Sequence, residues 1–177
     1  MGVFRLNHAV LYVRNVAQSV AFYQQALGFR PVAGMAELRG AAFLVAPGST
    51  NDHDLGLFEI GAGATDSPAG RTAVGLYHLA WEVDTLQDLS DAAERLTSMG
   101  ALHGASDHST TKALYAKDPD GIEFEVSWLV PADRITDDVL AGRTRIAPLD
   151  IDHEIQRYGA ETKSGIGVSR VLASALP

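Results

Sequence analysis

Four side chains that commonly bind divalent metals stand at matching positions in two halves of the chain. Residues 8–13 (HAVLYV) resemble residues 78–83 (HLAWEV), and residues 57–60 (LFEI) resemble residues 123–126 (EFEV). Each half therefore begins with a histidine and ends with a glutamate: His8 and Glu59 in the first half, His78 and Glu125 in the second. Imidazole and carboxylate groups suit Fe(II), Mn(II), Ni(II) or Zn(II), and two histidines with one carboxylate leave positions open for oxygen chemistry. The pattern predicts a metal site to which both halves contribute.

Sequence periodicity gives both halves the same order of elements. Residues 6–13 alternate as a strand does, and residues 16–27 carry apolar side chains at helical spacing before Gly28, a residue type common at helix C-termini. Residues 76–83 alternate again, and Thr85 is suited to cap a second helix that ends at Gly100. This internal repeat predicts an α+β fold, in which two βαβββ modules form one cupped, barrel-like mixed sheet with helices outside.

Changes in composition along the chain set the expected boundaries. Residues 1–130 form the repeated domain, with module 1 at about 4–60, a linker rich in small residues at 61–75, and module 2 at about 76–130. Residues 131–177 are a charged extension outside the repeat, expected to be partly helical with a disordered end.

The overall composition excludes several classes of function. The chain has 177 residues, no cysteine and a net charge of -8. The absence of cysteine excludes disulfides and thiolate sites and is compatible with the cytoplasm, where we expect the protein. The negative charge disfavours nucleic acid, and no apolar run is long enough to span a bilayer, so we expect neither as a partner. The expected partners are a small-molecule substrate and further copies of the chain, in a homo-oligomer such as a dimer.

A strong turn signal precedes the glutamate of the second half. Residues 118–121 read Asp-Pro-Asp-Gly, in which proline presets one backbone dihedral and glycine tolerates the left-handed one. In the strand that follows, Ile122, Phe124 and Val126 share one face, while Glu123 and Glu125 share the other. Glu125 is therefore expected on the polar face of the last strand of its module.

Together, the paired histidines, the turn and the glutamate four residues after its glycine resemble the vicinal oxygen chelate superfamily. This superfamily includes glyoxalase I, extradiol ring-cleaving catechol dioxygenases, epimerases and antibiotic-resistance proteins. The resemblance covers roughly residues 4–130 and is greatest to a small catechol 2,3-dioxygenase-type protein with one pair of modules. It implies an Fe(II)-dependent ring-cleaving dioxygenase acting on a catechol-like molecule, with His8, His78 and Glu125 as metal ligands. Mn(II), Ni(II) and Zn(II) are the alternatives to Fe(II).

The resemblance also implies three catalytic residues. His53 precedes a short apolar strand, as the catalytic histidine of the dioxygenases does. Tyr115, shortly before the turn, matches a tyrosine that hydrogen-bonds the substrate, and His108 belongs to an Asp-His pair that leads into the same strand. The implied roles are acid–base catalysis for His53, and substrate orientation and assistance with proton transfer for His108 and Tyr115.

Glu59 leaves an isomerase or lyase reaction as an alternative to ring cleavage. The resemblance aligns it with a fourth metal ligand of glyoxalase I and related epimerases, in which the metal stabilises an enediolate in an isomerase or lyase reaction. A fourth carboxylate would occupy the position that a dioxygenase leaves free for substrate or oxygen. We expect Glu59 to stay off the metal, on the same side of its strand as His53. A third alternative is a drug-binding resistance protein, which the presence of every metal-ligand type disfavours.

Overall fold

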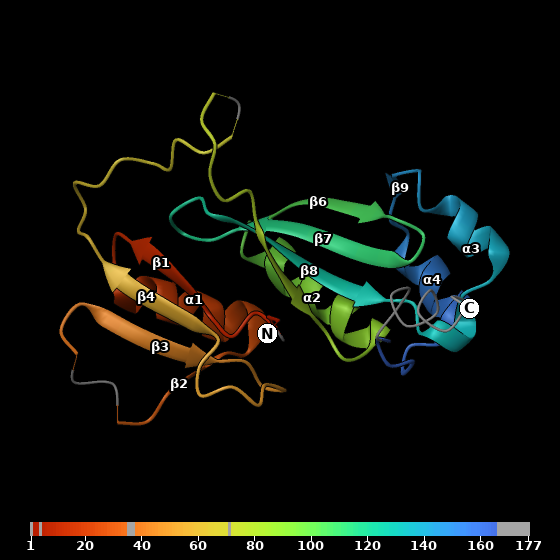
Figure 1. The fold of residues 1–177 in the computed structure, drawn as a ribbon, viewed down its shortest axis with the longest axis horizontal. Helices are drawn as coiled ribbons and strands as arrows, with labels where there is room; N and C mark the ends of the chain where they lie inside the picture. The colour runs from red at the N-terminus through yellow and green to blue at the C-terminus, as the bar shows by residue number, and fades with distance from the viewer. Residues whose placement is uncertain (1, 4, 35–37, 71, 166–177) are drawn as a thin grey trace. The chain divides into compact units, whose positions relative to one another are not determined.

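The computed structural model describes residues 2–3, 5–34, 38–70 and 72–165 and divides the chain into two compact units. Unit 1 comprises Met1–Ala73 and Asp118–Ile122, and unit 2 comprises Val74–Lys117 and Glu123–Pro177. Figure 1 shows the elements of each unit. Most of the terminal segment that was expected to be disordered lies outside the described residues.

Unit 1 is a mixed four-stranded sheet with a helix packed on one face. Its elements are β1 (Ala9–Val13), α1 (Val16–Leu27), β2 (Arg30–Pro31), β3 (Ala41–Val45) and β4 (Leu55–Glu59). The strand order is β1-β4-β3-β2, in which β1 and β4 are parallel and the other pairs antiparallel. Alternate side chains of the sheet form the buried layer under α1: Leu11, Val13, Leu44, Leu55 and Leu57. Each buried leucine contributes roughly 1.5–3 kcal/mol.

Both ends of α1 are fixed by residues that the sequence makes recognisable. The Asn15 side chain accepts a hydrogen bond from the backbone N–H of Gln18 at 2.8 Å, so it caps the helix N-terminus. Gly28 ends the helix with a φ of 72°, a left-handed conformation that glycine adopts without strain. The predicted helix over residues 16–27 is confirmed.

Unit 2 is a mixed five-stranded sheet that carries two longer helices and two short ones. Its elements are β5 (Leu79–Glu82), α2 (Leu86–Ser98), β6 (Leu102–Asp107), β7 (Thr111–Lys117), β8 (Glu123–Leu129), the 3-10 turn η1 (Ala132–Arg134), α3 (Asp137–Gly142), β9 (Ala147–Pro148) and α4 (Ile151–Tyr158). The strand order is β5-β8-β7-β6-β9, and only the β5–β8 pair is parallel. Thr85 caps α2 in a reciprocal arrangement with Asp88, as its sequence position predicted.

The extension that follows the repeat is part of unit 2. α3, β9 and α4 gather at one end of the sheet (Figure 1), and β9 pairs with β6 at the sheet edge. Trp128 of β8 is fully buried; its ring lies 5.5 Å from that of Tyr158 in α4, and its Nε1 donates to the carbonyl of Thr162 at 2.9 Å. The extension therefore completes the core of this unit.

The predicted α+β fold is confirmed. Each unit runs strand–helix–strand–strand–strand, and each sheet is mixed, with its first and last repeat strands parallel and adjacent. No helix within the described residues is long and apolar enough to cross a membrane.

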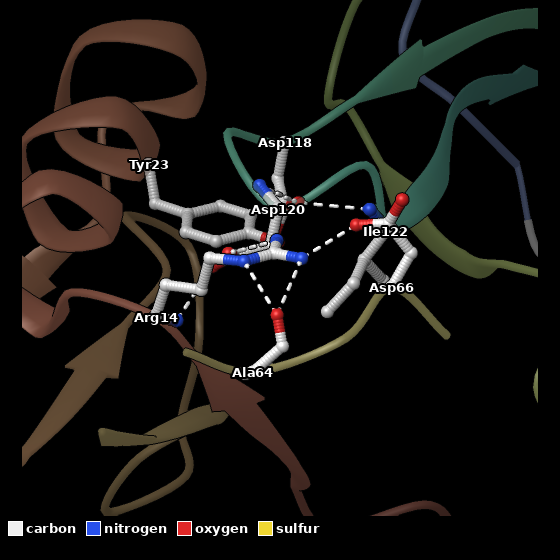
Figure 2. A network of polar contacts seen from close by, with 7 residues as sticks. All are labelled: Arg14, Tyr23, Ala64, Asp66, Asp118, Asp120 and Ile122. Carbon is white, nitrogen blue, oxygen red and sulfur yellow. Dashed lines mark hydrogen bonds and ion pairs between the residues drawn. The ribbon is translucent and has the colours of Figure 1, made fainter. Parts of the chain in front are cut away.

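The Asp-Pro-Asp-Gly turn belongs to unit 1, where Arg14 holds it. Arg14 Nη1 donates to Asp120 Oδ1 at 2.9 Å, and the Arg14 backbone N–H donates to Asp120 Oδ2 at 3.1 Å (Figure 2). The same guanidinium group donates to the carbonyl of Ala64 and forms an ion pair with Asp66. A planar group with several donors thus joins the end of β1, the segment after β4 and the turn.

Asp118 organises the turn from inside. Its Oδ1 accepts hydrogen bonds from the backbone N–H groups of Asp120 and Ile122, each at 2.9 Å, and its Oδ2 accepts one from the Tyr23 hydroxyl at 3.2 Å (Figure 2). Burial raises the pKa of the Asp118 carboxyl, although the two backbone hydrogen bonds oppose that shift. The carboxyl is thus buried with its hydrogen-bond donors around it, and these compensate part of the cost of burial.

Candidate functional site

Unit 2 brings His78 and Glu125 together on one face of its sheet. The parallel β5–β8 register places Ala80 opposite Glu125, so His78, two residues before Ala80, projects from the same face. His78 Nε2 lies 3.3 Å from Glu125 Oε2, and the two side chains are 25% and 13% exposed. His78 Nδ1 is buried without a hydrogen-bond partner among the described residues. An imidazole and a carboxylate at this separation, partly shielded from water, fit the requirements of a divalent metal.

Tyr115 and His108 extend this group across the neighbouring strand. The β7–β8 register pairs Tyr115 with Glu125, and His108 Nε2 lies 3.0 Å from the Tyr115 hydroxyl oxygen. Burial raises the pKa of Tyr115 to about 12, and the charge and hydrogen bonding of Glu125 add to the shift. Tyr115 therefore remains a neutral phenol at physiological pH, able to donate a hydrogen bond.

The same face carries a second histidine–glutamate pair that the sequence analysis did not single out. His103 Nε2 lies 3.2 Å from Glu123 Oε2, and the nearby charge of Glu123 raises the pKa of Tyr77. The alternation that put Glu123 on the face of Glu125 was visible in the sequence. Its partner His103 lies on β6, two strands away, and no local pattern marks that neighbour.

Unit 1 brings the other two predicted histidines together. The rings of His8 and His53 have centroids 4.5 Å apart, and the ring of Phe43 lies 4.9 Å from that of His53. His53 Nδ1 is 2.9 Å from Asp52 Oδ2, and His8 Nδ1 is 2.8 Å from Asn7 Oδ1. Each ring thus has one nitrogen engaged by a neighbouring side chain, which fixes its orientation.

Strand register shows that Gly56, and not Glu59, is the counterpart of Glu125. The second residue after each histidine, Val10 or Ala80, pairs with Gly56 in unit 1 and with Glu125 in unit 2. The sequence repeat aligned Glu59 with Glu125, but strand pairing places the equivalent of Glu125 three positions earlier, at Gly56. A Cβ atom at position 56 would lie 3.4 Å from both the Phe43 ring and the Val10 side chain. The position has no carboxylate, and an aromatic ring covers it.

Glu59 has a different function in the fold. Its Oε2 accepts a hydrogen bond from the backbone N–H of Val16 at 3.0 Å, at the N-terminus of α1, where a negative charge is favourable. By alternation it shares the helix-facing side of β4 with Leu55 and Leu57. The prediction that Glu59 and His53 share a face is wrong, because the chain bends at Asp54, whose buried carboxylate accepts from Ala46 N–H and Ser49 Oγ.

Each unit thus brings a pair of candidate site residues together. Unit 2 contributes His78 with Glu125, and unit 1 contributes His8 beside His53. Within the described part of either unit, no three histidine, cysteine or acidic side chains gather as a metal-binding cluster.

A sequence model of the Glyoxalase/Bleomycin resistance protein/Dioxygenase superfamily matches residues 5–126, more than half of the chain. The chain belongs to this superfamily. The matched region begins just before the first candidate histidine and ends just after Glu125, so it contains every predicted site residue.

The chain resembles proteins with different described functions. The chain is 31% identical to catechol-2,3-dioxygenase of Bacillus subtilis (strain 168) over 68% of its own length, and it spans only 40% of that protein. It resembles the structure of a glyoxylase/bleomycin resistance protein/dioxygenase domain from Frankia sp. EAN1pec, with 26% identity and a TM-score of 0.61 over 73% of this chain and all of the other. The fosfomycin resistance protein FosX of Listeria monocytogenes shares the fold, with 15% identity and a TM-score of 0.55 over 76% of this chain and 100% of that one. A further FosX structure contains Mn(II).

Proposed function

We propose that this superfamily member is a metal-dependent extradiol-type dioxygenase that cleaves the ring of a catechol-like small molecule. The proposed ligands of Fe(II) are His78 and Glu125, with His8 as the third. The main support is the pairing of Gly56 with Val10, because it leaves the position equivalent to Glu125 without a carboxylate. A site with three protein ligands keeps positions free for two adjacent substrate oxygens and for dioxygen. The similarity to a catechol-2,3-dioxygenase agrees with this proposal.

The position of Glu59 disfavours the isomerase or lyase alternative. The isomerase or lyase reaction would need Glu59 as a fourth metal ligand. Instead, the Glu59 carboxylate accepts a hydrogen bond from the Val16 N–H at the start of α1, on the helix-facing side of the sheet. To bind a metal on the other face of β4, the Glu59 side chain would have to break its hydrogen bond to Val16 and change the face on which it lies.

The remaining site residues have complementary proposed roles. Bound Fe(II) would supply Lewis acidity and one-electron chemistry. The Tyr115 hydroxyl, held neutral by burial and by Glu125, would donate a hydrogen bond to a substrate oxygen, and His108 at 3.0 Å would orient that hydroxyl and exchange a proton with it. His53, between Asp52 and the rings of His8 and Phe43, would act as the acid–base group.

The test is anaerobic reconstitution with Fe(II), followed by oxygen uptake against a panel of alkyl- and aryl-substituted catechols. We expect one metal per chain and a yellow ring-opened product, with one O2 consumed per substrate. Glu125→Gln should lose most of the bound metal, because a neutral amide is a weak ligand for a divalent ion.

Glu59→Gln is the matched control, since an amide oxygen can still accept the hydrogen bond of Val16. It should keep full metal occupancy and activity. Loss of metal in Glu59→Gln with retention in Glu125→Gln would contradict the ligand assignment. Product formation without oxygen uptake would favour an isomerase, and His8→Ala with full metal content would remove His8 from the ligand set.

A further inference from the structure

The turn that carries His108 is held by the extension that follows the repeat. This turn joins β6 to β7; the His108 N–H donates to the carbonyl of Thr111 at 2.9 Å, and Ser109 adopts a left-handed φ of 69°. A serine in this conformation is uncommon and needs support from its surroundings. The support is a hydrogen bond from the Ser109 N–H to Asp107 Oδ1 and another from Ser109 Oγ to the carbonyl of Val139 in α3, at 2.6 and 2.7 Å.

A buried lysine connects the same turn to α4. Lys112 is fully buried, and its Nζ donates to Asp107 Oδ1 at 2.5 Å. Nζ also forms an ion pair with Glu154 in α4, at 3.0 Å from its Oε2. Asp107 Oδ1 therefore accepts hydrogen bonds from both Lys112 Nζ and the Ser109 N–H, which connects the buried lysine to the turn.

Two further contacts restrain the turn from the extension. β9 pairs with the end of β6, with Ala147 opposite Asp107. Gly142, the last residue of α3, packs so closely on the turn that a Cβ atom there would collide with Ser109 Oγ. α3 and β9 thus contact the two residues that flank His108, Ser109 and Asp107, and α4 is connected to Asp107 through Lys112.

We propose that Lys112 and Glu154 are positioning residues, through which the extension holds His108 against Tyr115. The inference rests on the proposed function in that His108 assists proton transfer to or from the substrate. Glu154 holds Lys112, and Lys112 in turn holds the Asp107 carboxylate. Asp107 accepts from the Ser109 N–H and so restrains the turn. The turn orients the His108 ring, whose Nε2 lies 3.0 Å from the Tyr115 hydroxyl oxygen. Among the described residues, neither Lys112 nor Glu154 contacts His78 or Glu125, so we expect their substitution to leave metal binding unchanged.

The test is a double-mutant cycle between Glu154→Gln and His108→Gln in the Fe(II)-reconstituted full chain. His108→Gln should lower kcat by about 100-fold, the lower end of a general acid–base contribution. Glu154→Gln should lower kcat by about tenfold with metal content unchanged, and it should add no further loss in the His108→Gln background. Asp152→Asn, an exposed change on the same helix, is the control and should leave kcat unchanged.

A second readout does not need activity. The ¹⁵N signals of the His108 ring report its hydrogen bond to Tyr115, and they should shift in Glu154→Gln but not in Asp152→Asn. Unchanged ring signals in Glu154→Gln would overturn the inference, as would losses in kcat that simply multiply in the double variant, because both results indicate a purely structural ion pair. If the wild-type chain consumes no oxygen, the proposed function fails, and the ring signals alone decide the positioning role.

If Glu154→Gln does not fold, Gly142→Ala perturbs the turn from its other side. Its methyl group would push on Ser109 Oγ, so the His108 ring signals should again shift. A Gly142→Ala variant with wild-type ring signals would contradict the proposal.

Discussion

Replacing Tyr23 with Phe removes one hydroxyl from the interior of unit 1. That hydroxyl donates to Asp118 Oδ2 at 3.2 Å, and the Tyr23 and Asp118 side chains are both buried (Figure 2). A hydrogen bond to a charged acceptor contributes about 1.5–3 kcal/mol, and this one is longer than the usual distance between two oxygens. The expected loss is therefore near the lower limit, about 1.5 kcal/mol of the free energy of unfolding at pH 7.

The same substitution should change how stability depends on alkaline pH. Burial and the nearby Asp118 carboxylate raise the pKa of Tyr23 well above its ordinary value of 10.0. Above pH 10 the unfolded chain loses this phenolic proton while the folded chain keeps it, so wild-type stability falls as pH rises through that range. Tyr23→Phe has no such proton, and the difference between the two proteins should shrink above pH 10.

Urea unfolding from pH 6 to pH 10.5, followed by circular dichroism, measures both effects. Tyr12→Phe is the matched control: its side chain is exposed, so we expect a change within about 0.5 kcal/mol. Equal stability of Tyr23→Phe and the wild type at pH 7 would refute the claim that this hydrogen bond supports the turn. A constant difference across the alkaline range would refute the titration argument.

Three further substitutions test the site and the fold. His78→Ala should abolish stoichiometric metal binding, because it removes the imidazole 3.3 Å from Glu125; elemental analysis that shows full occupancy would contradict this. Gly28→Ala should lower stability by about 1 kcal/mol, because alanine is strained at a φ of 72°; an unchanged urea midpoint would show that the helix end can relax. Leu57→Ala should lower stability by about 2–5 kcal/mol, because it leaves a cavity under α1; a loss below 1 kcal/mol in urea unfolding would show that the sheet collapses around the gap.

The helices and the order of elements follow directly from local sequence signals. Asn15 and Gly28 enclose α1, and Thr85 begins α2, because capping depends only on residues within one turn of the helix.

Strand register was the main feature that the sequence did not reveal. The four-letter match around Glu59 and Glu125 compares residue types, whereas equivalence in a sheet depends on which residues pair across strands. The hydrogen bonds of β1 with β4 select Gly56, and a glycine carries no chemical signal by which to find it. Glu154 and Lys112 were missed for a related reason, since they are 42 positions apart and only the packing of α4 brings them together.

Because the Asp-Pro-Asp-Gly turn belongs to unit 1, the gene cannot be divided simply between its two repeats. Asp118–Ile122 belongs to unit 1, although the strands on both sides of it belong to unit 2. A fragment that ends at residue 73 would therefore leave Arg14 without Asp120 and Tyr23 without Asp118. Exchange of one module between homologues would combine an arginine and a tyrosine from one parent with a turn from the other. Recombinants of this kind should survive only where those four residues are inherited as a compatible set.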